Sequence, residues 1–173
     1  MSLLMRSARS LLDLQQPVLG GSSPTAWPIT RPAPAICSPS FDPSSLLWRL
    51  QKLFHETGGL VNTEELLAPL RDRYDQPLSV LARWIVDRRV VSFEARGERW
   101  LPLFQFDTDL LVVLCGVEHA IRELHDVFDD GELAEWFATS NGWLQNASPA
   151  AMVSIDPAAV INAARADRYV ATC

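Results

Sequence analysis

Three histidines are the side chains of this 173-residue chain best suited to acid–base chemistry or to metal binding. His119 and His125 are six positions apart, which puts them on different faces of a helix. His55 stands alone near the end of a predicted helix, where a cation suits the helix dipole. Because no HExxH, GxSxG or GxGxxG pattern or Walker-type loop occurs, we expect capping or surface histidines. The sequence therefore predicts a non-catalytic protein without a cofactor.

The three cysteines, Cys37, Cys115 and Cys173, are far apart and form no CxxC pair. This spacing argues against both a disulfide framework and a structural zinc site, and it favours a reducing compartment. The N-terminal residues lack the long apolar region of a signal peptide. The longest apolar run, 110–115, is too short to span a bilayer. We expect a cytoplasmic protein that does not bind membranes or metals.

Carboxylates cluster between Asp126 and Glu135, but not in the alternating register of a calcium-binding loop. The cluster belongs to a wider charge asymmetry. Residues 104–173 carry 3 basic and 11 acidic side chains, whereas the rest of the chain is close to neutral. The net charge of −6 excludes a protein-wide basic surface for nucleic acid. An acidic half could instead steer the protein toward a basic partner.

The elements that position these residues are mainly helical. Apolar spacing and capping residues predict helices over 62–74 and 77–89, a β-hairpin over 90–106, and helices through most of the remaining chain, including one over 110–127. Seven of the 12 prolines fall before residue 44. We therefore divide the chain into a Pro-rich, flexible extension over 1–43, a helix-turn-helix-like unit with a hairpin over 44–107, and a C-terminal helical part over 108–173.

The two helices and the hairpin have the proportions of a helix-turn-helix with a wing. Five arginines there could contact phosphates, and they are Arg83, Arg88, Arg89, Arg96 and Arg99. Acidic residues interleave with them, and side chains suited to reading base edges are sparse. DNA binding is therefore an alternative, ranked below a purely structural role for this unit.

Three stretches of the sequence resemble elements of a known protein family, and they occur in the same order as in that family. The hairpin and the run Trp100-Leu101-Pro102-Leu103-Phe104-Gln105-Phe106-Asp107 resemble the "yPlFQFd" element of the Xre/MbcA/ParS antitoxin family. The stretch 135–152, with Trp136-Phe137-Ala138-Thr139-Ser140-Asn141-Gly142-Trp143-Leu144, is similar to its toxin-binding element. The helix over 160–169 resembles its C-terminal helix. The family's Thr-Pro-Asn is Thr-Ser-Asn here, and its Leu-Gly-Gly is Leu144-Gln145-Asn146.

The resemblance implies a protein partner. Members of this family bind a RES-domain toxin, an enzyme that consumes NAD, and block its active-site cleft. By position, the expected partner-binding residues are Trp136, Asn141, Trp143, Leu144, Pro149, Arg165, Arg168 and Tyr169. Of the bulky residues in this stretch, Phe137 is the one most expected in the core. A further alternative is an adaptor that forms homo-oligomers through residues 1–43.

Overall fold

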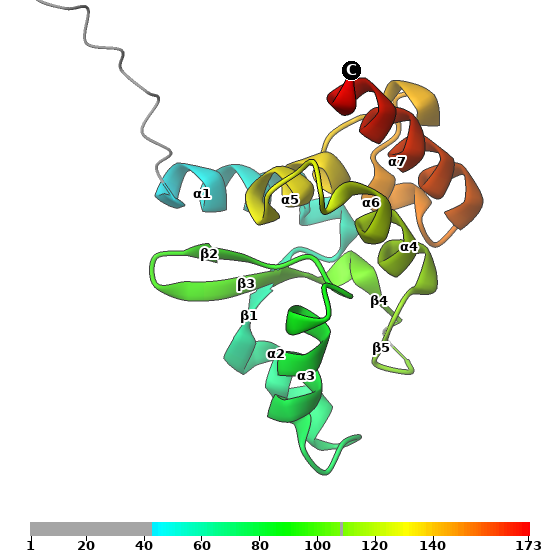
Figure 1. Ribbon diagram of the computed structural model, residues 1–173. Coiled ribbons are helices and arrows are strands. Elements are labelled where there is room, and N and C mark those ends of the chain that lie inside the picture. The colour runs from blue at the N-terminus through cyan, green and yellow to red at the C-terminus, as the bar shows by residue number, and fades with distance from the viewer. Residues whose placement is uncertain (1–42, 108) are drawn as a thin grey trace, which may run out of the picture. The chain divides into compact units, whose positions relative to one another are not determined.

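The computed structural model describes residues 43–107 and 109–173 (Figure 1). The described residues all belong to one compact unit, Pro39–Cys173. The predicted flexible extension, and oligomerisation through it, lie outside the described residues except for Pro43.

The described residues are mainly helical, as the sequence predicts. The α-helices are α1 (Pro43–Leu53), α2 (Thr63–Arg71), α3 (Pro77–Val86), α4 (Cys115–Leu124), α5 (Asp130–Ala138), α6 (Pro149–Met152) and α7 (Pro157–Thr172). The strands are β1 (Leu60–Asn62), β2 (Phe93–Ala95), β3 (Glu98–Pro102), β4 (Phe106–Asp107) and β5 (Val112–Val113). Short 3-10 turns are η1 (His55–Thr57), η2 (Leu103–Gln105) and η3 (Gly142–Leu144). No helix in the described part is long and apolar enough to cross a membrane.

Capping residues explain where several helices begin. In α2, the Asn62 side chain accepts from the Glu65 backbone, and the Glu65 carboxylate accepts from the Asn62 backbone. Asp129 and Glu132 form the same reciprocal pair at the start of α5. Each such pair is a capping box, which provides acceptors for two backbone N–H groups that have no partner inside the helix. The acidic cluster that the sequence shows at 126–135 is thus partly the start of a helix.

The hairpin belongs to a three-stranded antiparallel sheet with strand order β1-β3-β2. Phe93 of β2 pairs with Trp100 of β3, and Asn62 of β1 pairs with Trp100 on its other side. The two strands are joined by Arg96 and Gly97, whose φ angles are 56° and 78°. Positive φ at both positions is the geometry of a tight two-residue hairpin turn.

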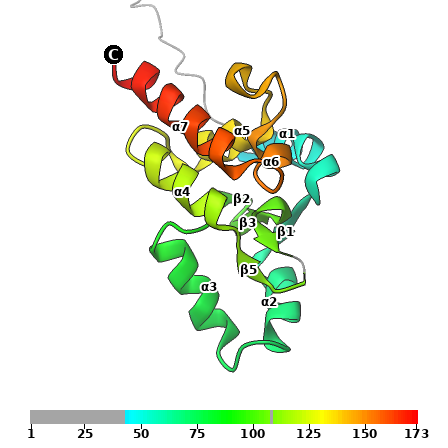
Figure 2. The same ribbon diagram turned by 90° about the vertical axis from the view of Figure 1, so that its right-hand side faces the viewer.

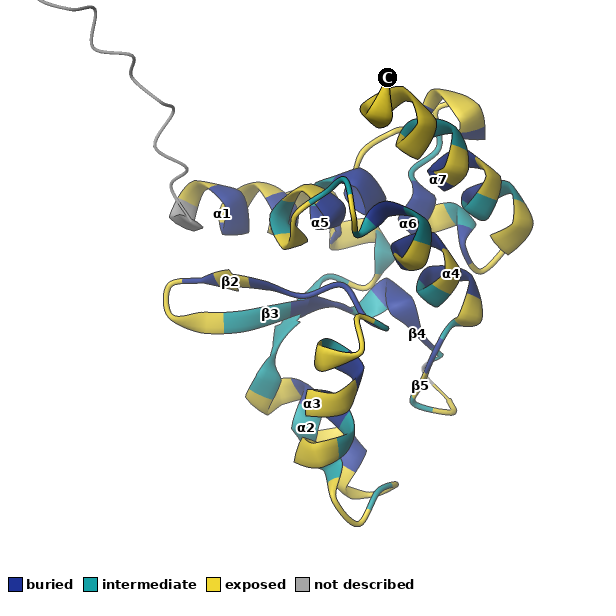
Figure 3. Ribbon diagram, viewed as in Figure 1, coloured by how far each residue is buried: buried dark blue, intermediate teal, exposed yellow. Residues whose placement is uncertain are grey.

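Two hydrophobic clusters hold these elements together. Figure 3 marks the buried residues of each element in dark blue. The larger cluster joins α1 and β2 to α4–α7 and centres on fully buried side chains such as Phe54, Phe93 and Phe137. The smaller one packs α2 and α3 against β3, with Leu70, Leu81 and Trp84 in its interior. Helix α1 therefore shares its core with the C-terminal helices, although α2 is the next α-helix in the sequence.

A buried glutamine fastens the region between the sheet and α4. The Gln105 side chain accepts from the Val91 backbone N–H at 2.7 Å and donates to the Val91 and Pro102 carbonyls at 3.0 and 2.9 Å. It is fully buried. A polar side chain without water must find such partners, so the "FQF" stretch has a structural reason for its polar residue.

One predicted helix begins later than expected. The stretch 110–127 was predicted helical throughout, but α4 starts only at Cys115. Before it, Val112 and Val113 pair with Asp107 and Phe106 as a short two-stranded ladder. The Asp107 carboxylate accepts from the backbone of Asp109 and Leu110, which bends the chain between the two strands. The apolar spacing at 110–114 fits a helix, but this turn and two β-branched residues favour a strand.

Candidate functional site

The carboxylate of Asp167, on α7, accepts three side-chain N–H groups that come from one stretch of the chain. Trp136 Nε1 and Asn141 Nδ2 donate to Oδ2 at 2.8 and 2.7 Å, and Trp143 Nε1 donates to Oδ1 at 2.9 Å. The three donor residues lie 24–31 positions before Asp167 in the chain. Three of the eight predicted partner-binding residues thus meet at one acidic group.

The loop between α5 and α6 presents these donors because it closes on itself. The Asn141 side chain accepts from the Trp143 backbone N–H at 2.9 Å, and the Asn141 backbone donates to the Ala147 carbonyl at 3.0 Å. Gln145 and Asn146 have φ angles of 57° and 66°, which turn the chain back after η3. The result is a short, closed loop with Trp143 near its tip.

Trp136 and Trp143 differ in exposure although both donate to the same carboxylate. Trp136 is 9% exposed and packs edge-on against Phe137, with ring centroids 4.9 Å apart. Trp143 is 63% exposed. Phe137 is fully buried, as predicted. Trp143 is therefore a large apolar ring held at the surface by a hydrogen bond at one edge.

Leu144 and Pro149 are buried, so they support the loop instead of offering surface to a partner. Leu144 belongs to the larger hydrophobic cluster, and Pro149 follows the Ser148 cap at the start of α6. Tyr169, at the C-terminal end of α7, is 71% exposed, and Val170 beside it is 66% exposed. The predicted set thus divides into an exposed part and a supporting part.

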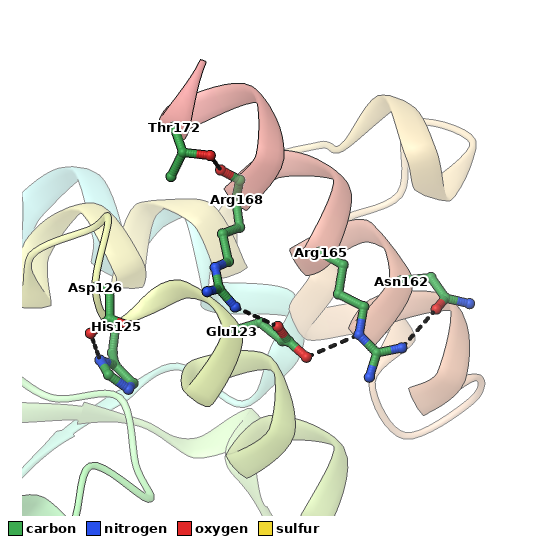
Figure 4. A network of polar contacts seen from close by, with 7 residues as sticks. All are labelled: Glu123, His125, Asp126, Asn162, Arg165, Arg168 and Thr172. Atoms are coloured by element: carbon green, nitrogen blue, oxygen red, sulfur yellow. Dashed lines mark hydrogen bonds and ion pairs between the residues drawn. The ribbon is translucent and has the colours of Figure 1, made fainter.

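The other flank of α7 carries two arginines that bind a carboxylate on α4, shown in Figure 4. Arg165 Nε donates to Glu123 at 2.9 Å, and Arg168 donates to its second oxygen at 3.1 Å. The hydrogen bond from Arg165 is the main cause of a lowered pKa for Glu123, with Arg168 adding to it and partial burial opposing it. The predicted partner-binding arginines are therefore engaged within the chain, although both remain half-exposed.

The five arginines of the DNA-binding alternative also fall into two groups. Arg89 is bound to Glu118 of α4, and Arg99 binds Glu94 at 2.7 Å and Ser92 at 3.0 Å. Arg83, Arg88 and Arg96 are exposed and form no ion pair within the described residues. Two of the five thus have their charge balanced by a neighbouring carboxylate.

The residue that sequence reasoning missed is Asp167 itself. It stands between Arg165 and Arg168 in a polar helix end, and nothing within a turn of it distinguishes it from a solvated acid. Its partners become neighbours only when α7 packs beside the 141–147 loop. The indole N–H group of Trp136 was the available signal, because a buried indole N–H usually finds an acceptor.

Nothing outside the geometry assigns a role to this site. No group of three or more histidine, cysteine or acidic side chains in the described part could hold a metal ion. No family model matches the chain, and neither a curated protein nor a solved structure matches it.

Proposed function

We propose that this chain is a non-catalytic, antitoxin-like protein that binds and neutralises a RES-type, NAD-consuming toxin through its C-terminal half. Two kinds of support lead to this proposal. The first is the order of the three family-like stretches along the sequence. The second is a single structural observation, the exposed indole of Trp143 held by Asp167.

A fixed, exposed tryptophan is what a protein interface needs at its centre. Tryptophan contributes a large apolar area and loses little conformational entropy when its rotamer is already held. The hydrogen bond to Asp167 restrains the ring before any partner arrives. Tyr169 is also exposed, on the last turns of α7. Tryptophan and tyrosine are among the residue types that protein interfaces concentrate.

The charge distribution supports a basic partner. The C-terminal 70 residues carry a net charge of −8, and a field of that sign accelerates encounter with a positively charged cleft. Such steering depends on ionic strength. Association with the proposed partner should therefore slow as salt is added, even where the apolar contacts keep the complex stable.

The test is co-expression with the product of the adjacent gene, followed by affinity purification and an NAD-consumption assay. We expect a stable complex in which the toxin is inhibited. Trp143→Ala should weaken the complex at least about tenfold, the scale of an interface hot spot. Trp48→Ala is a matched control, because Trp48 is 66% exposed but lies on α1.

The proposal fails if the neighbouring protein does not form a complex, or if the two tryptophan variants weaken binding equally. Circular dichroism and thermal melting of both variants separate a lost contact from a lost fold. Equal melting temperatures with unequal binding would support a direct contact by Trp143.

DNA binding is the second candidate, and one observation favours it. The order α1-β1-α2-α3-β2-β3, with β3 between β1 and β2, resembles that of a winged helix-turn-helix, although α1 packs with the C-terminal helices and not with α2 and α3. The exposed positions of α3 are less favourable. Leu78 is 61% exposed and Val86 is 78% exposed, and neither can read the polar edge of a base pair. We therefore rank DNA binding below protein binding.

Gel shifts on the protein's own promoter test the second candidate. Arg88→Ala removes an exposed charge beside α3, whereas Arg89→Ala also breaks the ion pair with Glu118. If α3 contacts DNA, Arg88→Ala weakens binding and reduces its dependence on salt. Binding that is absent at low salt, or that neither substitution changes, would exclude this role.

A further inference from the structure

A cationic groove between α4 and α7 is the feature that the proposed function leaves unused. The groove has a volume of about 390 Å³ and is lined by His119, Arg122, Glu123, Ala158, Ile161, Asn162 and Arg165. Its volume falls in the range of small-molecule sites, which is about 300–1,000 Å³. The two helices run in the same direction (Figure 2), because Gly116 lies close to Pro157 near their starts and Glu123, near the end of α4, binds Arg165 in the middle of α7.

The charges on this face oppose those of the surrounding sequence. Residues 104–173 contain three arginines and eleven acidic residues. Arg122 and Arg165 line the groove, and Arg168 binds Glu123 in its wall. Glu123 is the one carboxylate among the lining residues. All three arginines of this otherwise acidic half of the chain thus lie in or beside one groove.

The donors in the groove are only partly used. Arg165 Nε donates to Glu123, and one terminal nitrogen of Arg165 donates to Asn162 Oδ1 at the long distance of 3.5 Å (Figure 4). Arg122 is exposed and forms no ion pair within the described residues. The guanidinium fork matches the oxygens of a phosphate group in a bidentate way. Asn162 and His119 add further hydrogen-bonding groups.

From this we infer a binding site for a phosphate-bearing small molecule in the α4–α7 groove. Arg122 and Arg165 would hold the phosphate, and Ile161 and Ala158 would contact the apolar part of the ligand. The two arginines and Arg168, less the charge of Glu123, leave a net charge of +2, which a phosphate dianion balances. The inference does not depend on the proposed partner.

The site would also connect to the partner-binding face. Arg165 and Arg168 flank Asp167 on the same helix, and that carboxylate holds Trp143 on the opposite side. A ligand that draws Arg165 from Glu123 would change how the end of α7 is held against α4. This coupling, unlike the ligand site itself, rests on the proposed function: ligand binding and partner binding would then influence each other reciprocally.

Isothermal titration of the full chain with sodium pyrophosphate tests the site, with sodium chloride at matched ionic strength as the blank. We expect saturable binding that Arg122→Gln weakens at least about tenfold, the effect of losing one charge-assisted hydrogen bond. Arg71→Gln is the control, because Arg71 is an exposed arginine on α2 and its loss changes the net charge equally. A second titration uses a short DNA duplex.

Each outcome decides the inference. Saturable pyrophosphate binding that Arg122→Gln weakens and Arg71→Gln does not would support a small-molecule site. Binding no stronger than the chloride blank would overturn it, and so would equal effects of the two substitutions. Binding of the duplex alone, weakened by Arg122→Gln, would also overturn it, because the phosphate would then belong to a nucleic-acid backbone. These titration results are interpreted in the same way whether or not the toxin complex forms.

Discussion

Two carboxylates hold the two flanks of α7, and they do so by different physical means. Asp167 accepts three uncharged N–H groups, two of which belong to buried residues. Glu123 instead accepts two guanidinium groups that are about half-exposed. A buried donor that loses its acceptor keeps its full desolvation cost, whereas an exposed arginine is readily hydrated. The Asp167 flank is therefore expected to contribute more to the free energy of unfolding than the Glu123 flank.

The Asp167→Ala substitution should have the largest effect, because it leaves Trp136 and Asn141 without an acceptor. We expect a loss of about 3 kcal/mol in the free energy of unfolding, measured by urea denaturation. Asp109→Ala, at an exposed carboxyl in a loop, should change it by less than about 0.5 kcal/mol. Similar losses in the two variants would mean that the three hydrogen bonds to Asp167 contribute little.

Gly116→Ala tests the spacing on which the Glu123 flank depends. A Cβ at this position would lie 2.8 Å from Pro157 Cβ and 3.0 Å from Val153 Cγ2. Forcing α4 and α7 apart should cost about 2 kcal/mol of stability, as overpacking typically does. Gly142→Ala is the control, because a Cβ there meets no atom within 4 Å. If both alanine variants melt at the same temperature, α4 and α7 are not tightly packed at Gly116.

Glu123→Gln isolates the charged part of the same flank. We expect a loss of about 0.5–1 kcal/mol at neutral pH, because the arginines remain hydrated. The pKa of Glu123 is lowered from its ordinary value of 4.5 in the folded protein. Its contribution is therefore complete above the unfolded-state pKa and disappears as pH falls through the lower, folded-state pKa. Denaturation curves over an acid pH series should show the wild type and the variant converging below pH 4.5; a constant difference would contradict the pairing.

Controls apart, Trp143→Phe should have the smallest effect on stability of these substitutions. It keeps an exposed ring but removes the N–H that binds Asp167, and water can hydrate the freed oxygen. We expect a change of about 0.5 kcal/mol by urea denaturation. The proposed partner should still bind more weakly, since the ring is no longer held before contact. A stability loss as large as that of Asp167→Ala would show that the Trp143 bond dominates the cluster.

Local signals in the sequence were sufficient for most helix starts. The Asn62–Glu65 and Asp129–Glu132 boxes satisfy their helix ends with residues three positions apart. The Arg96–Gly97 turn needs only the two residues that form it. The segment before α4 was mispredicted because a side-chain turn at Asp107 competed with an apolar pattern that also fits a helix.

The candidate site was only half accessible to such reasoning. Trp136, Asn141 and Trp143 were expected together from their place in one stretch. Leu144 and Pro149 were expected beside them, but burial places them beneath the surface. Whether a residue in an amphipathic loop faces outward depends on what packs against it. Here α7 packs against both η3 and α6.

The sequence by itself determined the mainly helical fold, the short hairpin and the concentration of acidic residues in the last 70 positions. These features follow from periodicity, caps, turns and composition, all of which act over a few residues. Only the tertiary structure decided that Asp167 would collect three N–H groups and that the arginines of the acidic half would share one groove. Both depend on contacts between residues 24–45 positions apart. The sequence close to these side chains does not indicate which distant residues they will contact in the folded protein.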